Sequence, residues 1–277
     1  MTATAGWHTR AVLRCATDGA VTPADEAVAV EAPIALVFNG VSHVVMMATP
    51  LHLSELGLGF ALSEGLLDDA AQCYGIDVVD TDLGWEVRMD VATRCFTRLQ
   101  ERKRQLSGRT GCGVCGVESL QQWAQVPSRA PGWSAPGWLS SWDTDPARAQ
   151  PTVLALQNAL AELPDRQVLN AATGALHAAA WVTPQEGQLL QVFEDVGRHN
   201  ALDKLLGHLA RTATPLSEGW VLMTSRASHE LVHKCIRAGV PLLATVSAPT
   251  TLAMDAAQAG QLRLWAWCRD GRFSAFA

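Results

Sequence analysis

Short apolar runs and alternating stretches divide this chain into two parts with different patterns. Up to about residue 105, β-branched runs predict strands at residues 27–30, 35–38 and 41–47. Polar and apolar residues alternate at 75–79 and 84–91, which predicts two further strands. With one helix among these strands, the first part is predicted to be a small α+β unit.

The helix expected over residues 51–67 has a clear start but a weak interior. Thr49 and Pro50 supply an N-cap and a first-turn proline, and Glu55 places an acid in the first turn. Gly57 and Gly59 each cost the helix up to about 1 kcal/mol relative to alanine. The formation of this helix must therefore depend on packing.

The second part alternates helices with strands after a loop at 126–150 that is rich in proline, serine and glycine. The expected strands are 178–182, 189–193, 220–224, 241–246 and 262–267, the expected helices are 152–163, 201–210, 228–239 and 250–260, and a turn is expected at 170–175. This alternation indicates a three-layer α/β domain. The predicted division is a small domain at 1–106, a connection at 107–150 and an α/β domain at 151–277.

Composition and charge are those of an ordinary globular protein. The 277 residues are 48% hydrophobic and 17% charged, which suits one large or two moderate domains. A net charge of −6 argues against general nucleic-acid binding. No apolar run predicts a membrane span, and the N-terminus lacks the apolar core of a secretion signal. Seven cysteines without framework spacing suit a reducing compartment, so we expect a cytoplasmic protein.

The strongest chemical signal is segment 108–116, where Cys112 and Cys115 form a CxxC pair among glycines. Glycines let the backbone approach a bulky partner closely. Three arginines and a lysine at 102–109 would stabilise a thiolate over a thiol, and the thiolate is the nucleophile. The segment therefore predicts a reactive cysteine.

Three chemistries compete for this cysteine pair. A structural zinc site would need a second ligand pair, and none of the other five cysteines has a cysteine within four residues, although His229 and His233 leave a mixed site conceivable. A thioredoxin-like pair normally opens a helix directly after a strand near the start of its domain, unlike this pair. A sulfur carrier, with a persulfide on one cysteine, fits the glycines and the charge best.

Polar groups follow three predicted strands of the second part at their C-terminal ends. Arg226, then Ser247 and Thr250, and finally residues 269–272 each come after a strand. Ligands of open α/β sheets bind at this edge. Helix starts bind anions, and arginines hold phosphate with paired N–H groups. We therefore expect a nucleotide or a phosphorylated cofactor there.

Five motifs give the chain a resemblance to the formate dehydrogenase accessory sulfurtransferase family, FdhD. The string Glu-Asp-Val-Gly-Arg-His-Asn-Ala-Leu-Asp-Lys at 194–204 is highly specific. The other matching segments are 108–116, 173–179, 247–250, and 47–50 followed by Glu64-Gly65. The motifs occur in the family's order and span nearly the whole chain.

The resemblance implies a function and a set of site residues. Such proteins take persulfide sulfur from a cysteine desulfurase and pass it to the molybdenum or tungsten bis(molybdopterin guanine dinucleotide) cofactor of formate dehydrogenase. Cys112 then corresponds to the persulfide carrier, and Cys115 to its companion. The resemblance also implies a cytidine-deaminase-like larger domain and a homodimer. The expected cofactor-binding residues are Trp267, Cys268, Arg269, Asp270, Gly271 and Arg272, with Ser247, Thr250, Arg226, His177 and Arg198.

The implied fold does not carry deaminase chemistry with it. Zinc deaminases need an H-x-E motif followed later by P-C-x-x-C. Here two alanines follow His177, and the CxxC pair precedes it. We therefore expect neither deamination nor a permanently bound metal. Two other functions stay open, a non-catalytic cofactor chaperone and a dithiol oxidoreductase.

Some of these residues also have a structural interpretation. Asp195 and Arg198, with His199, either shape the cofactor site or close the turn before helix 201–210 through hydrogen bonds. Cys268 is best explained as a small buried residue at a strand end rather than as a sulfur relay.

Overall fold

Two β-sheets organise the chain in this computed structural model, which describes residues 6–106, 129 and 146–276. The N-terminal sheet has the strand order β4-β3-β6-β5. Alternate residues of β3 and β6 point toward helix α1 and are buried with it. The elements of this part are β3 (Ala32–Phe38), β4 (Val41–Ala48), α1 (Leu53–Ser63), the short 3₁₀ helix η1 (Ala70–Gln72), β5 (Cys73–Thr81), β6 (Gly84–Val91) and α2 (Thr93–Leu106).

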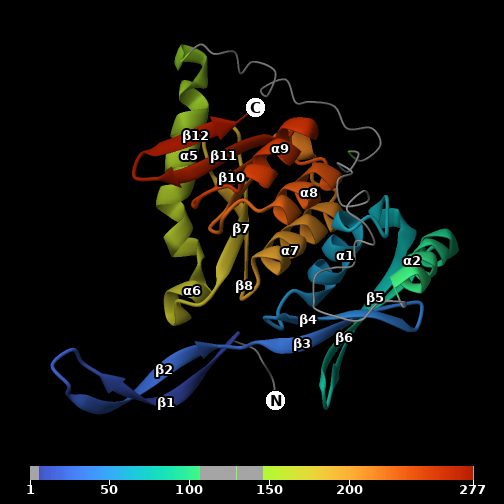
Figure 1. Cartoon of the computed structure of the whole chain (residues 1–277), viewed down its shortest axis with the longest axis horizontal. Coiled ribbons are helices and arrows are strands. Elements are labelled where there is room, and N and C mark those ends of the chain that lie inside the picture. The colour runs from blue at the N-terminus through green and yellow to red at the C-terminus, as the bar shows by residue number, and fades with distance from the viewer. Residues whose placement is uncertain (1–5, 107–128, 130–145, 277) are drawn as a thin grey trace.

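The larger sheet has six strands in the order β12-β11-β10-β9-β7-β8 (Figure 1). Strands β9, β10 and β11 are parallel, whereas β7 and β12 run antiparallel to their neighbours. The elements of this part are α5 (Pro146–Arg166), α6 (Val168–Thr173), β7 (His177–Val182), β8 (Leu189–Asp195), α7 (Arg198–Arg211), η2 (Leu216–Glu218), β9 (Trp220–Met223), α8 (His229–Ala238), β10 (Leu242–Thr245), α9 (Thr251–Ala259), β11 (Arg263–Arg269) and β12 (Arg272–Phe276).

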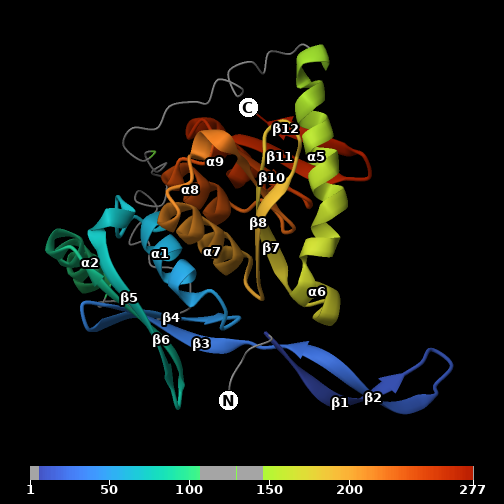
Figure 2. The same cartoon turned by 180° about the vertical axis from the view of Figure 1, so that it is seen from behind.

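Helices cover both faces of the larger sheet (Figure 2). Val221 and Leu243 belong to the core under α7, α8 and α9. Their neighbours Leu222 and Ala244 point the other way and are buried against α5. The chain is therefore a mixed α/β protein, as the sequence predicts, with its strands buried on two sides.

Helices α1 and α7 approach each other closely and join the two sheets. A Cβ atom at Gly59 would lie 1.8 Å from the carbonyl oxygen of Asp203, and one at Gly207 would lie 1.9 Å from that of Glu55. Only glycine leaves room for this contact. The glycine that weakens α1 by propensity is therefore required by its packing on α7.

A β-hairpin projects from the N-terminal part as an arm (Figure 1). Among the described strands, β1 (Trp7–Cys15) and β2 (Val21–Ala29) pair only with each other. Their register places Leu13 and Val21 on one face and Arg14 on the other. Leu13 is 68% exposed and Val21 is 55% exposed. The arm thus presents a largely apolar face that the rest of the described chain does not cover.

Several elements differ from the expectations. The turn predicted at 170–175 is wrong: this segment holds helix α6, which Gly174 ends in the left-handed conformation. Helix α1 begins at Leu53 rather than after Thr49, because Thr49 is buried and bonded to the segment before α7. The sequence pattern also missed β1, α2 and β12. The division into two domains stays a prediction, since most of the expected connection lies outside the described residues.

Candidate functional site

Three helices begin at one edge of the larger sheet. Helices α7, α8 and α9 each follow one of the mutually parallel strands β8, β9 and β10, so their N-termini lie at the carboxyl edge. Their N-cap residues are Gly197, Ser228 and Thr250. The Thr250 hydroxyl accepts a hydrogen bond from the N–H of Ala253 at 3.2 Å. The positive ends of three helix dipoles therefore favour anions at this edge.

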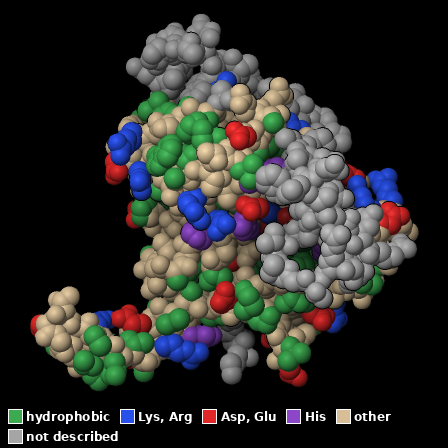
Figure 3. Space-filling model, in the orientation of Figure 1, with side chains coloured by type: hydrophobic (Ala, Val, Ile, Leu, Met, Phe, Trp, Pro, Cys, Tyr) green, Lys and Arg blue, Asp and Glu red, His purple; other side chains and the backbone are tan. Residues whose placement is uncertain are grey.

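Backbone hydrogen bonds hold the loops of this edge side by side. The N–H of Thr250 donates to the carbonyl of Ala227 at 3.1 Å, and the N–H of Trp267 donates to the carbonyl of Ser247 at 3.1 Å. Arg226 precedes Ala227 directly and is exposed. In this region Figure 3 shows Lys or Arg side chains beside His side chains. The structure thus brings together loops that lie far apart in the sequence.

His177 and Arg198 lie at the same carboxyl edge. His177 begins β7, which is antiparallel to β9, and the N–H of the next residue, Ala178, donates to the Thr224 hydroxyl at 2.9 Å. Burial and then the positive charge of Arg198 lower the pKa of His177. The imidazole is therefore expected to be neutral at pH 7.

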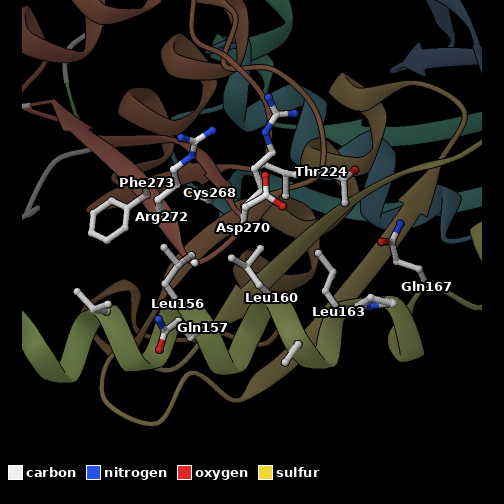
Figure 4. A pocket seen from close by; sticks show the side chains of 16 residues that line it. Leu156, Gln157, Leu160, Leu163, Gln167, Thr224, Cys268, Asp270, Arg272 and Phe273 are labelled. Carbon is white, nitrogen blue, oxygen red and sulfur yellow. The ribbon is translucent and has the colours of Figure 1, made fainter.

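A pocket of about 440 Å³ opens between α5 and the β11–β12 turn (Figure 4). Apolar side chains of α5 form one wall, and the turn at 268–273 forms the other. Figure 4 shows the labelled leucines of α5 pointing toward Asp270 and Cys268. Lining residues that the sequence analysis missed include Leu156, Leu160, Leu163, Gln167, Thr224 and Phe273. The i, i+4, i+7 spacing of the three leucines indicated only a buried helix face.

The β11–β12 turn places two arginines opposite each other. Asp270 and Gly271 form its corner with positive φ angles of 54° and 70°. Arg269 and Arg272 are directly paired across the two strands, and both are exposed. Like charges directly opposite each other destabilise a β-ladder. This arrangement would become favourable with an anion bound between the guanidinium groups.

Two residues of the expected cofactor segment differ from the others. Trp267 does not line the pocket, and its ring centroid lies 6.1 Å from that of Phe276. Cys268 lines the pocket but is buried, and burial raises its pKa to about 12. The Cys268 side chain is thus a thiol at neutral pH, which favours its structural interpretation.

The Asp195 carboxylate is the centre of a buried network. Its Oδ2 accepts from the N–H of Thr49 at 3.1 Å and lies 2.6 Å from Nζ of Lys204. Its Oδ1 accepts from the N–H of Gly197 at 2.8 Å and from Nδ2 of Asn200 at 3.0 Å. These bonds join the end of β4 to the start of α7. They explain Asp195 as a structural residue.

Histidines lie beside the starts of α7 and α8. Burial and then the charge of Arg198 lower the pKa of His199 to about 4, and burial and then His229 lower that of His233 to about 4. The ring centroids of His229 and His233 are 3.9 Å apart. Within the described part of the chain, no group of three or more His, Cys, Asp or Glu side chains could hold a metal ion.

Comparison with known proteins identifies the family. Residues 29–277 match the FdhD/NarQ family. The chain belongs to this family. It is 44% identical to the sulfur carrier protein FdhD of Acinetobacter baylyi, over 89% of this chain and 85% of that protein. It is 49% identical to the sulfur carrier protein FdhD of Chromobacterium violaceum, over 92% of this chain and 90% of that protein.

A solved structure has the same fold. It is described as a formate dehydrogenase accessory protein from Desulfotalea psychrophila, and it matches with a TM-score of 0.69 at 21% identity, over 98% of this chain and 96% of that chain. The family expected from the sequence motifs is confirmed, and so is the mixed α/β fold.

The two parts of the expected FdhD/NarQ site have different outcomes. The predicted binding residues from His177 to Arg272 gather at the carboxyl edge, although a role in binding stays a prediction for each of them. Cys112 and Cys115 lie outside the described residues. No helix in the described ranges has the length and apolar character needed to cross a membrane.

Proposed function

We propose that this protein is a sulfur carrier that binds a guanine-nucleotide-containing molybdenum cofactor at the carboxyl edge of its larger sheet. It passes persulfide sulfur to that cofactor for formate dehydrogenase. Relatives at 44% and 49% identity are named sulfur carrier proteins, which supports the chemistry. The pairing of Arg269 with Arg272 carries the binding part of the proposal.

The arginine pair suits a diphosphate. Arg269 and Arg272 project from opposed positions of one ladder, so an anion between them would contact both guanidinium groups. Each charge-assisted hydrogen bond contributes about 1.5–3 kcal/mol. Arg226 and the N-terminus of α9 lie on the neighbouring loops and add positive potential. Bound phosphate would replace a repulsion by attraction.

The adjacent pocket suits a purine base. Its volume of about 440 Å³ lies in the range typical of small-molecule sites. The leucines of α5 offer an apolar surface to a flat ring. The Asp270 carboxylate, on the opposite wall, could accept hydrogen bonds from the N1–H and amino group of guanine. Base and phosphates would thus be held by the same turn.

Sulfur moves in two balanced steps. The Cys112 thiolate attacks the outer sulfur of a desulfurase persulfide, which releases the desulfurase thiolate and leaves a persulfide on Cys112. The Cys115 thiolate then attacks Sγ of Cys112, which forms a Cys112–Cys115 disulfide and releases the outer sulfur as hydrosulfide to the metal. Cys115 supplies the electron pair, and an external dithiol reduces the disulfide afterwards.

Binding and carrying can be tested separately. GDP should protect residues around 247 and 267–272 in hydrogen exchange, and Arg269→Ala with Arg272→Ala should weaken GDP at least ten-fold by calorimetry. Arg166→Ala, an exposed arginine of α5 paired with Glu162, is the matched control and should bind as the unaltered protein does. Equal affinity of the double variant would overturn the proposed site.

Persulfide formation is tested by mass spectrometry after incubation with a cysteine desulfurase and cysteine. We expect about 32 Da on Cys112, none in Cys112→Ala, and an undelivered persulfide in Cys115→Ala. A Cys112→Ala variant that still restores formate dehydrogenase activity in cells would favour the chaperone function instead. Turnover of an insulin disulfide would favour a dithiol oxidoreductase.

We further propose that the protein acts in the cytoplasm as a homodimer and that its larger unit is cytidine-deaminase-like. Helices on both faces of the six-stranded sheet support this fold relationship. The exposed apolar face of the β1–β2 arm supports self-association, because an isolated two-stranded hairpin is only marginally stable in water.

A further inference from the structure

Arg129 is bound to the edge of the larger sheet that lies opposite the proposed nucleotide site. Its Nη1 donates to the carbonyl of Val240 at 3.3 Å, and its Nε donates to that of Gly260 at 3.2 Å. Its Nη2 donates to the carbonyl of Gln261. Helices α8 and α9 end at this edge, so one guanidinium holds two helix ends.

The chemistry of this contact favours arginine specifically. Carbonyl groups past a helix C-terminus lack intrahelical donors and carry the negative end of the helix dipole. The planar guanidinium presents several N–H groups at fixed angles, whereas a lysine ammonium is a single point charge. Arg129 is half-buried, so water competes less for these bonds. The contact is therefore a firm anchor for the backbone of residue 129.

The position of this anchor matters because of what precedes it in the sequence. Arg129 lies 14 residues after Cys115. A chain of 14 residues spans at most about 50 Å. Helix α8 has 10 residues and runs from the carboxyl edge to the opposite one, a distance of about 15 Å. The cysteine pair can therefore reach the nucleotide site while Arg129 stays bound.

We propose that Arg129 is a positioning residue that shortens the tether of the Cys112–Cys115 pair and so speeds delivery of sulfur to the cofactor. This inference rests on the proposed function. Without the anchor, the next described residue on that side is Pro146, which lies 31 residues after Cys115. Effective concentration falls roughly as the −3/2 power of tether length, so delivery should slow about three-fold.

The test separates loading from delivery. Full-length protein is loaded by a cysteine desulfurase and cysteine, freed of both, and mixed with purified molybdenum cofactor and a dithiol. Mass spectrometry then follows the loss of 32 Da from Cys112 and the formation of the Cys112–Cys115 disulfide. The variants are Arg129→Ala, Arg129→Lys and, as matched control, Arg166→Ala, which also loses a bond to a backbone carbonyl, that of Leu189.

We expect Arg129→Ala to load at the normal rate and to deliver about three-fold more slowly, with Arg129→Lys in between and Arg166→Ala unchanged. Delivery by Arg129→Ala at the normal rate would overturn the inference alone. An equal slowing of loading and delivery would also overturn it, because it would indicate a general structural effect. If the unaltered protein transfers no sulfur, the proposed function fails and the inference fails with it.

Discussion

Asp195 and Lys204 form an ion pair whose two side chains are fully buried, with Nζ 2.6 Å from Oδ2. Replacing Lys204 by methionine would leave the Asp195 charge in the interior without its cation. Breaking a buried pair in this way costs about 3 to 5 kcal/mol of unfolding free energy. Urea denaturation should show this loss for Lys204→Met.

The matched control for this prediction is the pair between Arg211 and Glu55, which lies 2.6 Å apart at the surface. Arg211→Ala should cost less than about 1 kcal/mol, because solvent screens an exposed pair. A Lys204→Met protein no less stable than Arg211→Ala would contradict the central place given to the Asp195 network.

The thiol of Cys268 gives a prediction about pH. Burial raises its pKa to about 12, so the reactive thiolate is a fraction on the order of one in ten thousand at pH 8 and grows about ten-fold per pH unit up to that value. Peptide mass spectrometry after brief iodoacetamide treatment at pH 8 should find Cys15, which is exposed, labelled and Cys268 unlabelled. Rapid labelling of Cys268 would revive its role as a sulfur relay.

At the scale of elements, the contact of α1 with α7 reverses the usual rule for glycine in helices. Gly59→Ala should raise helix propensity by about 1 kcal/mol. Here the added Cβ would lie 1.8 Å from the carbonyl oxygen of Asp203, so we expect a net loss of about 1 to 3 kcal/mol in unfolding free energy.

Gly75→Ala is the matched control for that substitution, because the nearest atom to a Cβ at Gly75 is a carboxylate oxygen of Asp90 at 3.8 Å. Thermal unfolding of the two variants should separate them clearly. If Gly59→Ala is as stable as Gly75→Ala, the two helices do not pack as closely as the structure shows.

At the scale of the whole molecule, the β1–β2 arm has an apolar face without a cover in the described chain. If that face joins two copies, Leu13→Glu with Val21→Glu should shift the protein from dimer to monomer in analytical ultracentrifugation. Arg14→Glu with Thr22→Glu, on the opposite face of the same hairpin, is the control and should stay dimeric. A dimer that survives the first pair of changes would place the interface elsewhere.

Sequence reasoning succeeded where the signal is local. Strand 84–91 was predicted with its observed bounds, and helix α8 begins after Ser228 and ends before Gly239 as expected. Alternation and capping residues act within a few positions, so they can be read from the chain itself. The specific motifs likewise fixed the family, and the strand ends pointed to the edge where His177, Arg226 and Arg269 gather.

Only the tertiary structure decided which distant residues meet. The pocket wall from α5 lies about 100 residues before the turn that it faces, and no local pattern couples them. Strand β12 needs β11 as its partner, and Gly59 is required only because α7 passes beside it. The chain alone thus determined its elements, its family and its candidate cysteine chemistry. Long-range packing and pairing decided the pocket, the arginine pair and the Arg129 anchor, because these depend on contacts that sequence separation hides.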